Sequence, residues 1–196
     1  MQDKQKSGIK QIRVACVGDS ITEMSGYPEF ASELLGSKYL VGNFGVCGSQ
    51  VSLGSECSYM YSAAFKNVKN FQPDVTIIML GTNDANLSIH EYQEGLVEDY
   101  LILIREFEAL LSKPKIWVVK PPPIFSEDVW LSGKIMDRIV IPSLEQVSKI
   151  SKLPLIDVYS ALCDERYFVD GVHPNEKGAR LIAEVICKAI TSKIGQ

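Results

Sequence analysis

Ser20 is the first residue whose position could support chemistry, because it follows an apolar run in the stretch Gly18-Asp19-Ser20. A serine at the start of a helix or turn meets free backbone N–H groups and the positive end of the helix dipole. Both favour an attacking alkoxide or a bound anion. Serine is also a preferred helix cap, so taken alone this stretch favours a cap over a nucleophile.

An acid–base pair is indicated near the end of the chain, in Asp170-Gly171-Val172-His173-Pro174. A carboxylate three residues before a histidine, in a turn, can approach the imidazole and fix its tautomer while the other ring nitrogen faces a nucleophile. The chain has only one other histidine, His90, which lacks such a partner in sequence and is interpreted as a surface residue.

Two further stretches carry groups that could stabilise a developing negative charge. The first contains Gly45 and Gly48, which allow a tight turn and a close approach of the backbone to a ligand. In Gly81-Thr82-Asn83-Asp84, the side chain of Asn83 offers a neutral NH₂ donor that stabilises an oxyanion without titrating. Each stretch is also an ordinary turn sequence when taken alone.

The elements that must position these residues can be predicted from hydrophobic periodicity. Five short β-branched runs, bounded by Gly, Pro or polar residues, are typical of buried parallel strands. They cover residues 12–17, 39–44, 75–80, 116–119 and 155–158.

Segments between these runs show helical spacing. The clearest are Tyr100, Leu103, Ile104, Phe107 and Leu111, and Ile182, Val185, Ile186 and Ala189. Helices are also expected over residues 28–35, 59–70 and 134–151, with a kink or restart at Pro142.

Strands that alternate with helices predict right-handed crossovers and one α/β domain over residues 1–196, a three-layer α/β/α sandwich with a flexible N-terminus over residues 1–10. Ligands bind beyond the carboxyl ends of the strands in such sheets. The four candidate stretches follow strands one, two, three and five. Together they predict a catalytic site at one edge of the sheet, which chance turn chemistry would seldom assemble.

Composition and charge exclude several classes of protein. The net charge of −4 and the absence of a basic cluster argue against a nucleic-acid partner. No apolar run approaches the roughly 20 residues needed to cross a bilayer. The polar start of the chain predicts a cytoplasmic protein, although a secreted or periplasmic protein trimmed of its leader would look the same. The five scattered cysteines predict neither a disulfide framework nor a zinc site.

Four separated motifs resemble those of the SGNH hydrolases, a branch of the GDSL esterase/lipase superfamily. They are GDSIT at residues 18–22, N-x-G-x-x-G at residues 43–48, GTND at residues 81–84 and D-x-x-H-P at residues 170–174. They occur in the order of the family and span nearly the whole chain. The resemblance implies a flavodoxin-like sheet with strand order 2-1-3-4-5 and no cofactor or metal.

The same resemblance implies a role for each candidate residue. Ser20 would be the nucleophile, His173 the general base and Asp170 its orienting carboxylate. The oxyanion would be bound by the backbone N–H groups of Ser20 and Gly48 and by the side chain of Asn83. Gly48 is preferred to Gly45 because the family's oxyanion glycine matches the second glycine of its block.

The sequence between the motifs is most similar to that of bacterial carbohydrate esterases and sialate O-acetylesterase-like proteins. This similarity implies removal of short acyl groups, chiefly acetyl, from a saccharide. Four rings in the expected site loops could stack on a sugar or could be core or rim packing. These four rings are Tyr59, Tyr61, Phe125 and Trp130.

Other functions remain open at this stage. The same five site residues would serve a lysophospholipase or a thioesterase. A phosphate- or flavin-binding module would use the loop after strand one, although it gives no reason to pair Asp170 with His173. A metal phosphoesterase is disfavoured because such sites draw on several histidines. The sequence does not determine the oligomeric state.

Overall fold

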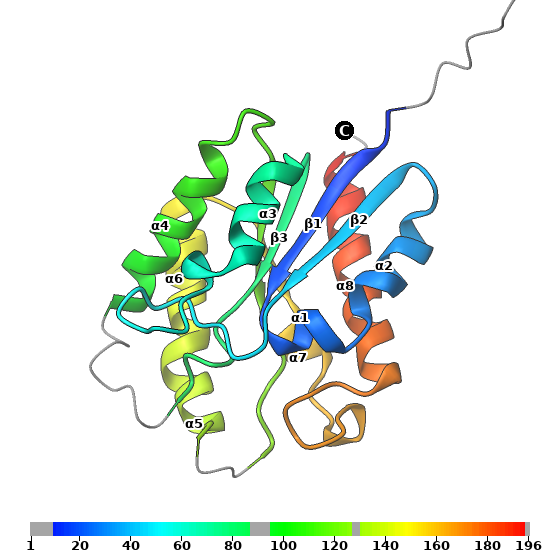
Figure 1. The fold of residues 1–196 in the computed structure, drawn as a ribbon. Helices are drawn as coiled ribbons and strands as arrows, with labels where there is room; N and C mark the ends of the chain where they lie inside the picture. The colour runs from blue at the N-terminus through cyan, green and yellow to red at the C-terminus, as the bar shows by residue number, and fades with distance from the viewer. Residues whose placement is uncertain (1–9, 87–94, 127–129, 195–196) are drawn as a thin grey trace, which may run out of the picture.

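The computed structural model describes residues 10–86, 95–126 and 130–194 (Figure 1). Within them, five parallel strands form one sheet in the order β2-β1-β3-β4-β5. This order confirms the one that the family resemblance implies. The strands are β1 (Ile12–Gly18), β2 (Tyr39–Gly45), β3 (Val75–Met79), β4 (Lys115–Lys120) and β5 (Leu155–Asp157), and each end lies within one residue of its prediction.

The helices alternate with the strands along the chain, as the α/β prediction requires. The α-helices are α1 (Ser20–Met24), α2 (Tyr27–Leu35), α3 (Ala63–Phe71), α4 (Leu96–Glu108), α5 (Gly133–Ile135), α6 (Ile141–Ser151), α7 (Val158–Ala161) and α8 (Glu176–Ile194). Short helical turns of other types are η1 (Tyr59–Tyr61), η3 (Met136–Val140) and η4 (Glu165–Tyr167).

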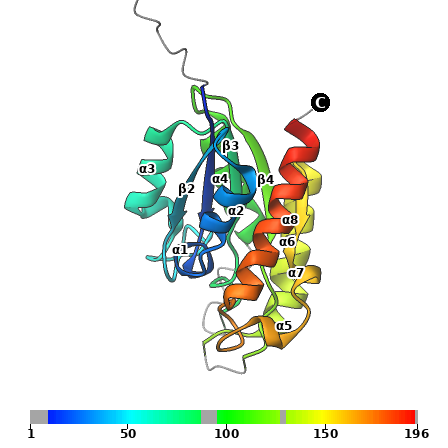
Figure 2. The ribbon, with the colours of Figure 1, turned by 90° about the vertical axis from the view of Figure 1, so that its right-hand side faces the viewer.

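The helices cover both faces of the sheet, which gives three layers. Successive side chains of a strand point to opposite faces. Ala15 and Val17 of β1 therefore pack in a core with α3, α4 and α6, whereas Val14 and Cys16 pack in a second core with α2 and α8. Figure 1 shows the first set of helices to the left of the strands and the second set to the right, and Figure 2 looks onto the face that α2 and α8 cover.

The predicted helix over residues 134–151 contains a change of helical type. A π-helical turn, η3, precedes α6, and the N–H of Ile141 donates to the carbonyl oxygen of Met136, five residues back. Pro142 lies in the first turn of α6, where the missing N–H of proline costs little. The restart expected at Pro142 is therefore confirmed.

Two other helix predictions need correction. The helix that contains Tyr100 ends at Glu108, and Leu111 lies beyond it with 92% of its surface exposed. Pro114 disfavours helical backbone at the residue before it, and Lys113 has a φ of 48°. The helix predicted over residues 59–70 is divided at Ser62, whose backbone is extended and whose hydroxyl caps α3 by accepting from the N–H of Phe65 at 3.1 Å.

No helix in the described part of the chain is long and apolar enough to span a membrane.

Candidate active site

Ser20 lies where β1 ends and α1 begins, but it is not the cap of that helix. The cap is Asp19, whose Oδ1 accepts a hydrogen bond from the N–H of Ile21 at 3.0 Å. Ser20 is the first helical residue, and its hydroxyl is not needed to satisfy the helix end. The Oγ of Ser20 instead lies 3.0 Å from Nε2 of His173, which is 153 residues away in sequence. The cap interpretation of Ser20 is therefore wrong.

The side chains of His173 and Asp170 are in contact, as their spacing predicts. Oδ2 of Asp170 lies 2.7 Å from Nδ1 of His173, and its Oδ1 accepts from the N–H groups of Val172 and His173 at 2.9 and 2.7 Å. The His173 side chain is 36% exposed and that of Asp170 is 52% exposed, so both remain within reach of solvent.

The charge of Asp170 selects the tautomer of the neutral His173 ring. Burial alone would raise the pKa of Asp170, but its hydrogen bonds from His173 and Val172 outweigh burial and lower the pKa to about 2. An ionised carboxylate only accepts hydrogen bonds, so the ring proton lies on Nδ1. The lone pair of Nε2 then faces the hydroxyl of Ser20, which is the arrangement that proton transfer from serine needs.

The turn that carries Asp170 and His173 is supported by the loop that follows β4. The N–H of Phe125 donates to the carbonyl oxygen of Gly171 at 2.8 Å. Gly171 has a φ of 82°, and a Cβ built there would lie 2.7 Å from the amide nitrogen of Ser126. Only glycine satisfies both the left-handed backbone and this close approach.

The loop after β2 contains two glycines with different surroundings. The N–H of Gly45 donates to Oδ1 of Asn43 at 3.0 Å, and a Cβ on Gly45 would lie 2.2 Å from the backbone nitrogen of Glu23 in α1. Gly48 has a φ of 74° and open space around it. Within the described residues the amide of Gly48 has no acceptor, and neither does that of Ser20. These two amides are free to bind an anion, whereas the amide of Gly45 is occupied.

Glu23 ties this loop to the helix that begins at Ser20. Its Oε2 accepts from the N–H of Cys47 at 2.6 Å, and its carbonyl oxygen accepts from the side chain of Asn43 at 3.3 Å. Glu23 was not among the predicted site residues. No sequence signal marks it, because a carboxylate three residues after Ser20 on a short helix usually faces solvent.

Asn83 lies beside the same loop. Its side-chain Nδ2 donates to the backbone carbonyl oxygen of Ser49 at 3.1 Å, and the backbone carbonyl oxygen of Asn83 accepts from Nε2 of Gln50 at 2.8 Å. The side-chain NH₂ group has two hydrogens, and the bond to Ser49 uses one of them. The other remains available to a ligand next to Gly48.

Two buried carboxylates lie beneath these loops. Asp19 is fully buried, and Oδ1 and Oδ2 of Asp84 accept from the amides of Val51 and Ser52 at 3.0 to 3.1 Å. Burial raises the pKa of each to about 6, although hydrogen bonds from backbone amides oppose the shift. The sequence presented Asp84 only as part of a turn, so its contact with the loop after β2 was missed.

The four aromatic candidates occupy different environments. Tyr59 must be corrected: its ring is 0% exposed and its hydroxyl donates to the carbonyl oxygen of Phe44 at 2.7 Å, so Tyr59 belongs to the core and cannot meet a ligand. Phe125 is partly buried and packs edge-on against Phe168. Trp130 and Tyr61 are 61% and 62% exposed, so their rings remain available to a ligand.

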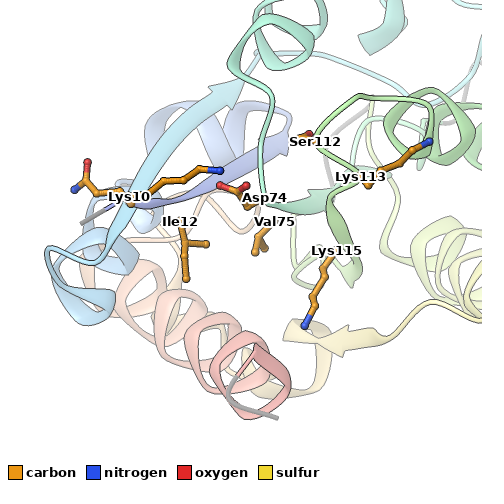
Figure 3. Close-up of a pocket in the computed structure, with 8 residues that line it drawn as sticks. Lys10, Ile12, Asp74, Val75, Ser112, Lys113 and Lys115 are labelled. Carbon is orange, nitrogen blue, oxygen red and sulfur yellow. The ribbon is translucent and has the colours of Figure 1, made fainter. Parts of the chain in front are cut away.

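A pocket of about 350 Å³ lies at the amino ends of the strands, on the side of the sheet away from Ser20 and His173 (Figure 3). Its lining includes Ile12, Val75 and Lys115, which are the first residues of β1, β3 and β4. Figure 3 shows the side chains of Lys113 and Lys115 pointing in different directions around it. The pocket is thus at the amino ends of the strands, whereas Ser20 and His173 meet at the carboxyl ends.

In the described residues, no three side chains of His, Cys, Asp or Glu are grouped so that they could hold a metal ion. His90, interpreted from the sequence as a surface residue, lies outside the described part of the chain, as do residues 1–9 of the N-terminus predicted to be flexible.

A parallel α/β sheet whose carboxyl edge joins a serine, a histidine and a carboxylate is equipped for nucleophilic attack on a carbonyl carbon. Comparison with known proteins agrees with this kind of chemistry. The model of the GDSL-like lipase/acylhydrolase family matches residues 16–181, and the chain belongs to that family of ester and acyl hydrolases.

One relative of known description is an acetylxylan esterase from Xylanibacter ruminicola, which is 32% identical over 206 aligned positions. The match covers 91% of this chain and 43% of the relative, so the chain spans less than half the length of that protein.

Solved structures show the same fold at lower identity. The inhibitor-bound aryl esterase of M. smegmatis superposes with a TM-score of 0.76 at 17% identity, over 92% of this chain and 98% of that one. Est24, a carbohydrate acetylesterase from Sinorhizobium meliloti, superposes with a TM-score of 0.72 at 20% identity, over 93% and 99%.

Proposed function

We propose that the protein is a serine esterase that removes short acyl groups, chiefly acetyl, from a carbohydrate. The observation that carries this proposal is the hydrogen-bonded chain from Asp170 through His173 to the Oγ of Ser20. The acetylxylan esterase, as a relative at 32% identity, supports the choice of acyl group and of a saccharide as the alcohol.

The reaction begins when Nε2 of His173 takes the hydroxyl proton of Ser20 as Oγ attacks the ester carbonyl carbon. Asp170 stabilises the imidazolium that forms. The tetrahedral intermediate collapses, the C–O bond to the alcohol breaks, and His173 protonates the departing oxygen. An acyl-serine remains. Water, deprotonated by His173, then attacks this acyl group; the bond from the acyl carbon to Oγ of Ser20 breaks, His173 returns the proton to Oγ, and the acid leaves.

The negative charge of the tetrahedral intermediate needs donors that are already in place. The backbone N–H groups of Ser20 and Gly48 and the second hydrogen of the Asn83 NH₂ group are the donors we assign. Their support is that each lacks a competing acceptor within the described residues.

We assign the saccharide-stacking role to the exposed ring of Trp130. Its neighbour Leu131 pairs with Asn86, and the N–H of Ser132 donates to the carbonyl oxygen of Ala85 at 2.9 Å. These contacts hold the loop of the exposed Trp130 beside the segment that follows Asn83. An aromatic face there can stack on a sugar ring.

The test is a comparison of hydrolysis rates for acetyl, butyryl and longer p-nitrophenyl esters, together with an acetylated xylooligosaccharide. We expect the highest kcat/KM on acetyl esters, and Ser20→Ala should abolish hydrolysis while the melting temperature is retained. A preference for long acyl chains would instead favour a lysophospholipase or thioesterase. Activity retained by Ser20→Ala would exclude Ser20 as the nucleophile, and a protein inert toward every ester would favour a binding module.

A further inference from the structure

The segment that carries Asn83 and the loop that carries Gly48 are joined by hydrogen bonds in both directions. Asn83 donates to Ser49 from its side chain and accepts from Gln50 at its backbone. The next residue, Asp84, accepts from the amides of Val51 and Ser52. Adjacent residues on one segment thus hold consecutive residues of the other.

Asp84 is the strongest member of this set of contacts. It is 4% exposed, and Val51 and Ser52 are buried with it. A buried carboxylate must have its oxygens satisfied, and a hydrogen bond from an amide to an ionised oxygen is stronger than one between neutral groups. The bonds from Asn83 and Gln50, in contrast, join neutral groups. The position of the loop therefore depends more on Asp84 than on Asn83 itself.

We propose that Asp84 is a positioning residue for the reaction: by holding Val51 and Ser52 it sets the Gly48 amide and the Asn83 NH₂ group at the separation that one oxyanion requires. Asp84 itself touches no reacting atom in this scheme. The inference rests on the proposed function, because it assigns Gly48 and Asn83 to the oxyanion. Displacement of catalytic groups by roughly 1 Å can lower a rate by about 10².

Asp99 of α4 offers a matched control. Its Oδ2 accepts from the amide of Leu53 at 2.8 Å, which is the next amide of the same loop. Unlike Asp84, Asp99 lies on a helix and is not adjacent in sequence to Asn83. Replacement of either carboxylate removes an anchor of this loop, but only Asp84 neighbours the segment that carries the oxyanion donor.

The experiment measures kcat and KM on p-nitrophenyl acetate for wild type, Asp84→Ala, Asp84→Asn, Asp99→Ala and Asn83→Ala. For Asp84→Ala we expect kcat to fall by about 10² with KM within about threefold, close to the loss in Asn83→Ala. Asp84→Asn keeps an acceptor oxygen for the two amides and should retain about a tenth of wild-type kcat. Asp99→Ala should lose less than about fivefold.

Equal losses of kcat in Asp84→Ala and Asp99→Ala, or a change confined to KM, would overturn the proposal. If Asp84→Ala does not fold, Asp84→Asn decides, and an unchanged kcat in that variant would refute the role. Amide hydrogen exchange without substrate separates this inference from the proposed function. If the wild type hydrolyses no ester, the proposed function fails, and unchanged exchange at residues 48–52 in Asp84→Asn would then overturn the positioning role as well, whereas faster exchange there would uphold it.

Discussion

Both ends of the sheet carry a carboxylate paired with a basic side chain. At the carboxyl ends of the strands, Asp170 accepts from two backbone amides and from the ring of His173. At the amino ends, Asp74 accepts from the backbone N–H of Arg13 at 2.8 Å and from its guanidinium at 3.4 Å. Burial opposes ionisation at both sites, yet these bonds lower the pKa of both carboxyl groups.

The two pairs differ in what lies beyond the basic group. Arg13 directs its other nitrogen to the carbonyl oxygen of Phe71 at 2.9 Å, so that pair ends on the backbone and holds β1 to the chain before β3. The second nitrogen of His173 reaches the hydroxyl of Ser20. A guanidinium stays protonated, whereas an imidazole can take up and return a proton near neutral pH. The pair at the amino ends therefore has a structural role, whereas under the proposed function the pair at the carboxyl ends has a chemical one.

The largest loss of activity should follow replacement of Asp170, the carboxylate at the carboxyl ends of the strands. Asp170→Asn should lower kcat on acetyl esters by about 10⁴, because an amide does not hold the His173 tautomer that accepts the proton of Ser20. Steady-state kinetics would measure it, with circular dichroism to establish that the fold is retained. A loss below about tenfold would mean that Asp170 does not orient His173 in the reaction.

Gly171→Ala should disturb the same edge by moving the turn between Asp170 and His173. The new methyl group would meet the amide nitrogen of Ser126, so we expect kcat to fall by about 10² as the imidazole shifts. The control is Gly36→Ala, since Gly36 also has a positive φ, of 73°, but has open space around it. Comparable kinetic losses in the two variants would attribute the effect to backbone strain rather than to the contact.

Asp19→Asn tests the buried carboxylate beside Ser20 through stability. Burial raises the pKa of Asp19 from 3.8 to about 6, so the folded protein binds this proton more tightly than the unfolded chain does. The stability gained from this shift is complete below about pH 3.8 and is lost as the pH rises through about 6. The amide of the variant does not titrate, yet its carbonyl oxygen can still accept from the N–H of Ile21.

Between about pH 5 and about pH 8, the free energy of unfolding of wild type should therefore fall by about 1.5 kcal/mol relative to that of Asp19→Asn. Urea denaturation at the two pH values measures this difference. A difference that does not change with pH would show that Asp19 does not titrate with a raised pKa.

The smallest effect should come from the carboxylate at the amino edge. Asp74→Asn should leave kcat and KM unchanged and lower the free energy of unfolding by less than about 1 kcal/mol, because the pair with Arg13 is partly exposed. A loss of esterase activity comparable to that of Asp170→Asn would remove the distinction between the two edges.

Much of this arrangement could be predicted from the sequence. The five β-branched runs predicted strand ends to within one residue. For β1, β3 and β4 the reason is that a strand buried on both faces must be apolar along its length, whereas β2 and β5 are only partly buried. The motif around His173 indicated its pairing with Asp170 because the two are three residues apart and the contact is local. Predictions were poorer where the outcome depended on packing, as at Leu111 and Tyr59.

The aromatic residues illustrate why the remainder could not be predicted. Tyr59 and Tyr61 are two residues apart and look alike in sequence, yet one ring is wholly buried and the other is mostly exposed. The 3₁₀ turn η1 points them in different directions. The direction of a side chain in a short turn depends on the neighbouring residues that pack against it, and the local sequence does not specify them.

By itself, the sequence determined the order of the elements, the family to which the chain belongs and the local pairing of Asp170 with His173, since each depends on periodicity or short spacing. Only the tertiary structure decided that Asp19 caps α1 and leaves the hydroxyl of Ser20 to His173, and that Asp84 holds the loop next to Gly48. The contacts of Ser20 and Asp84 join residues that are 32 to 153 positions apart in the sequence and that the parallel strands bring together at their carboxyl ends. Local sequence spacing does not predict contacts over such separations.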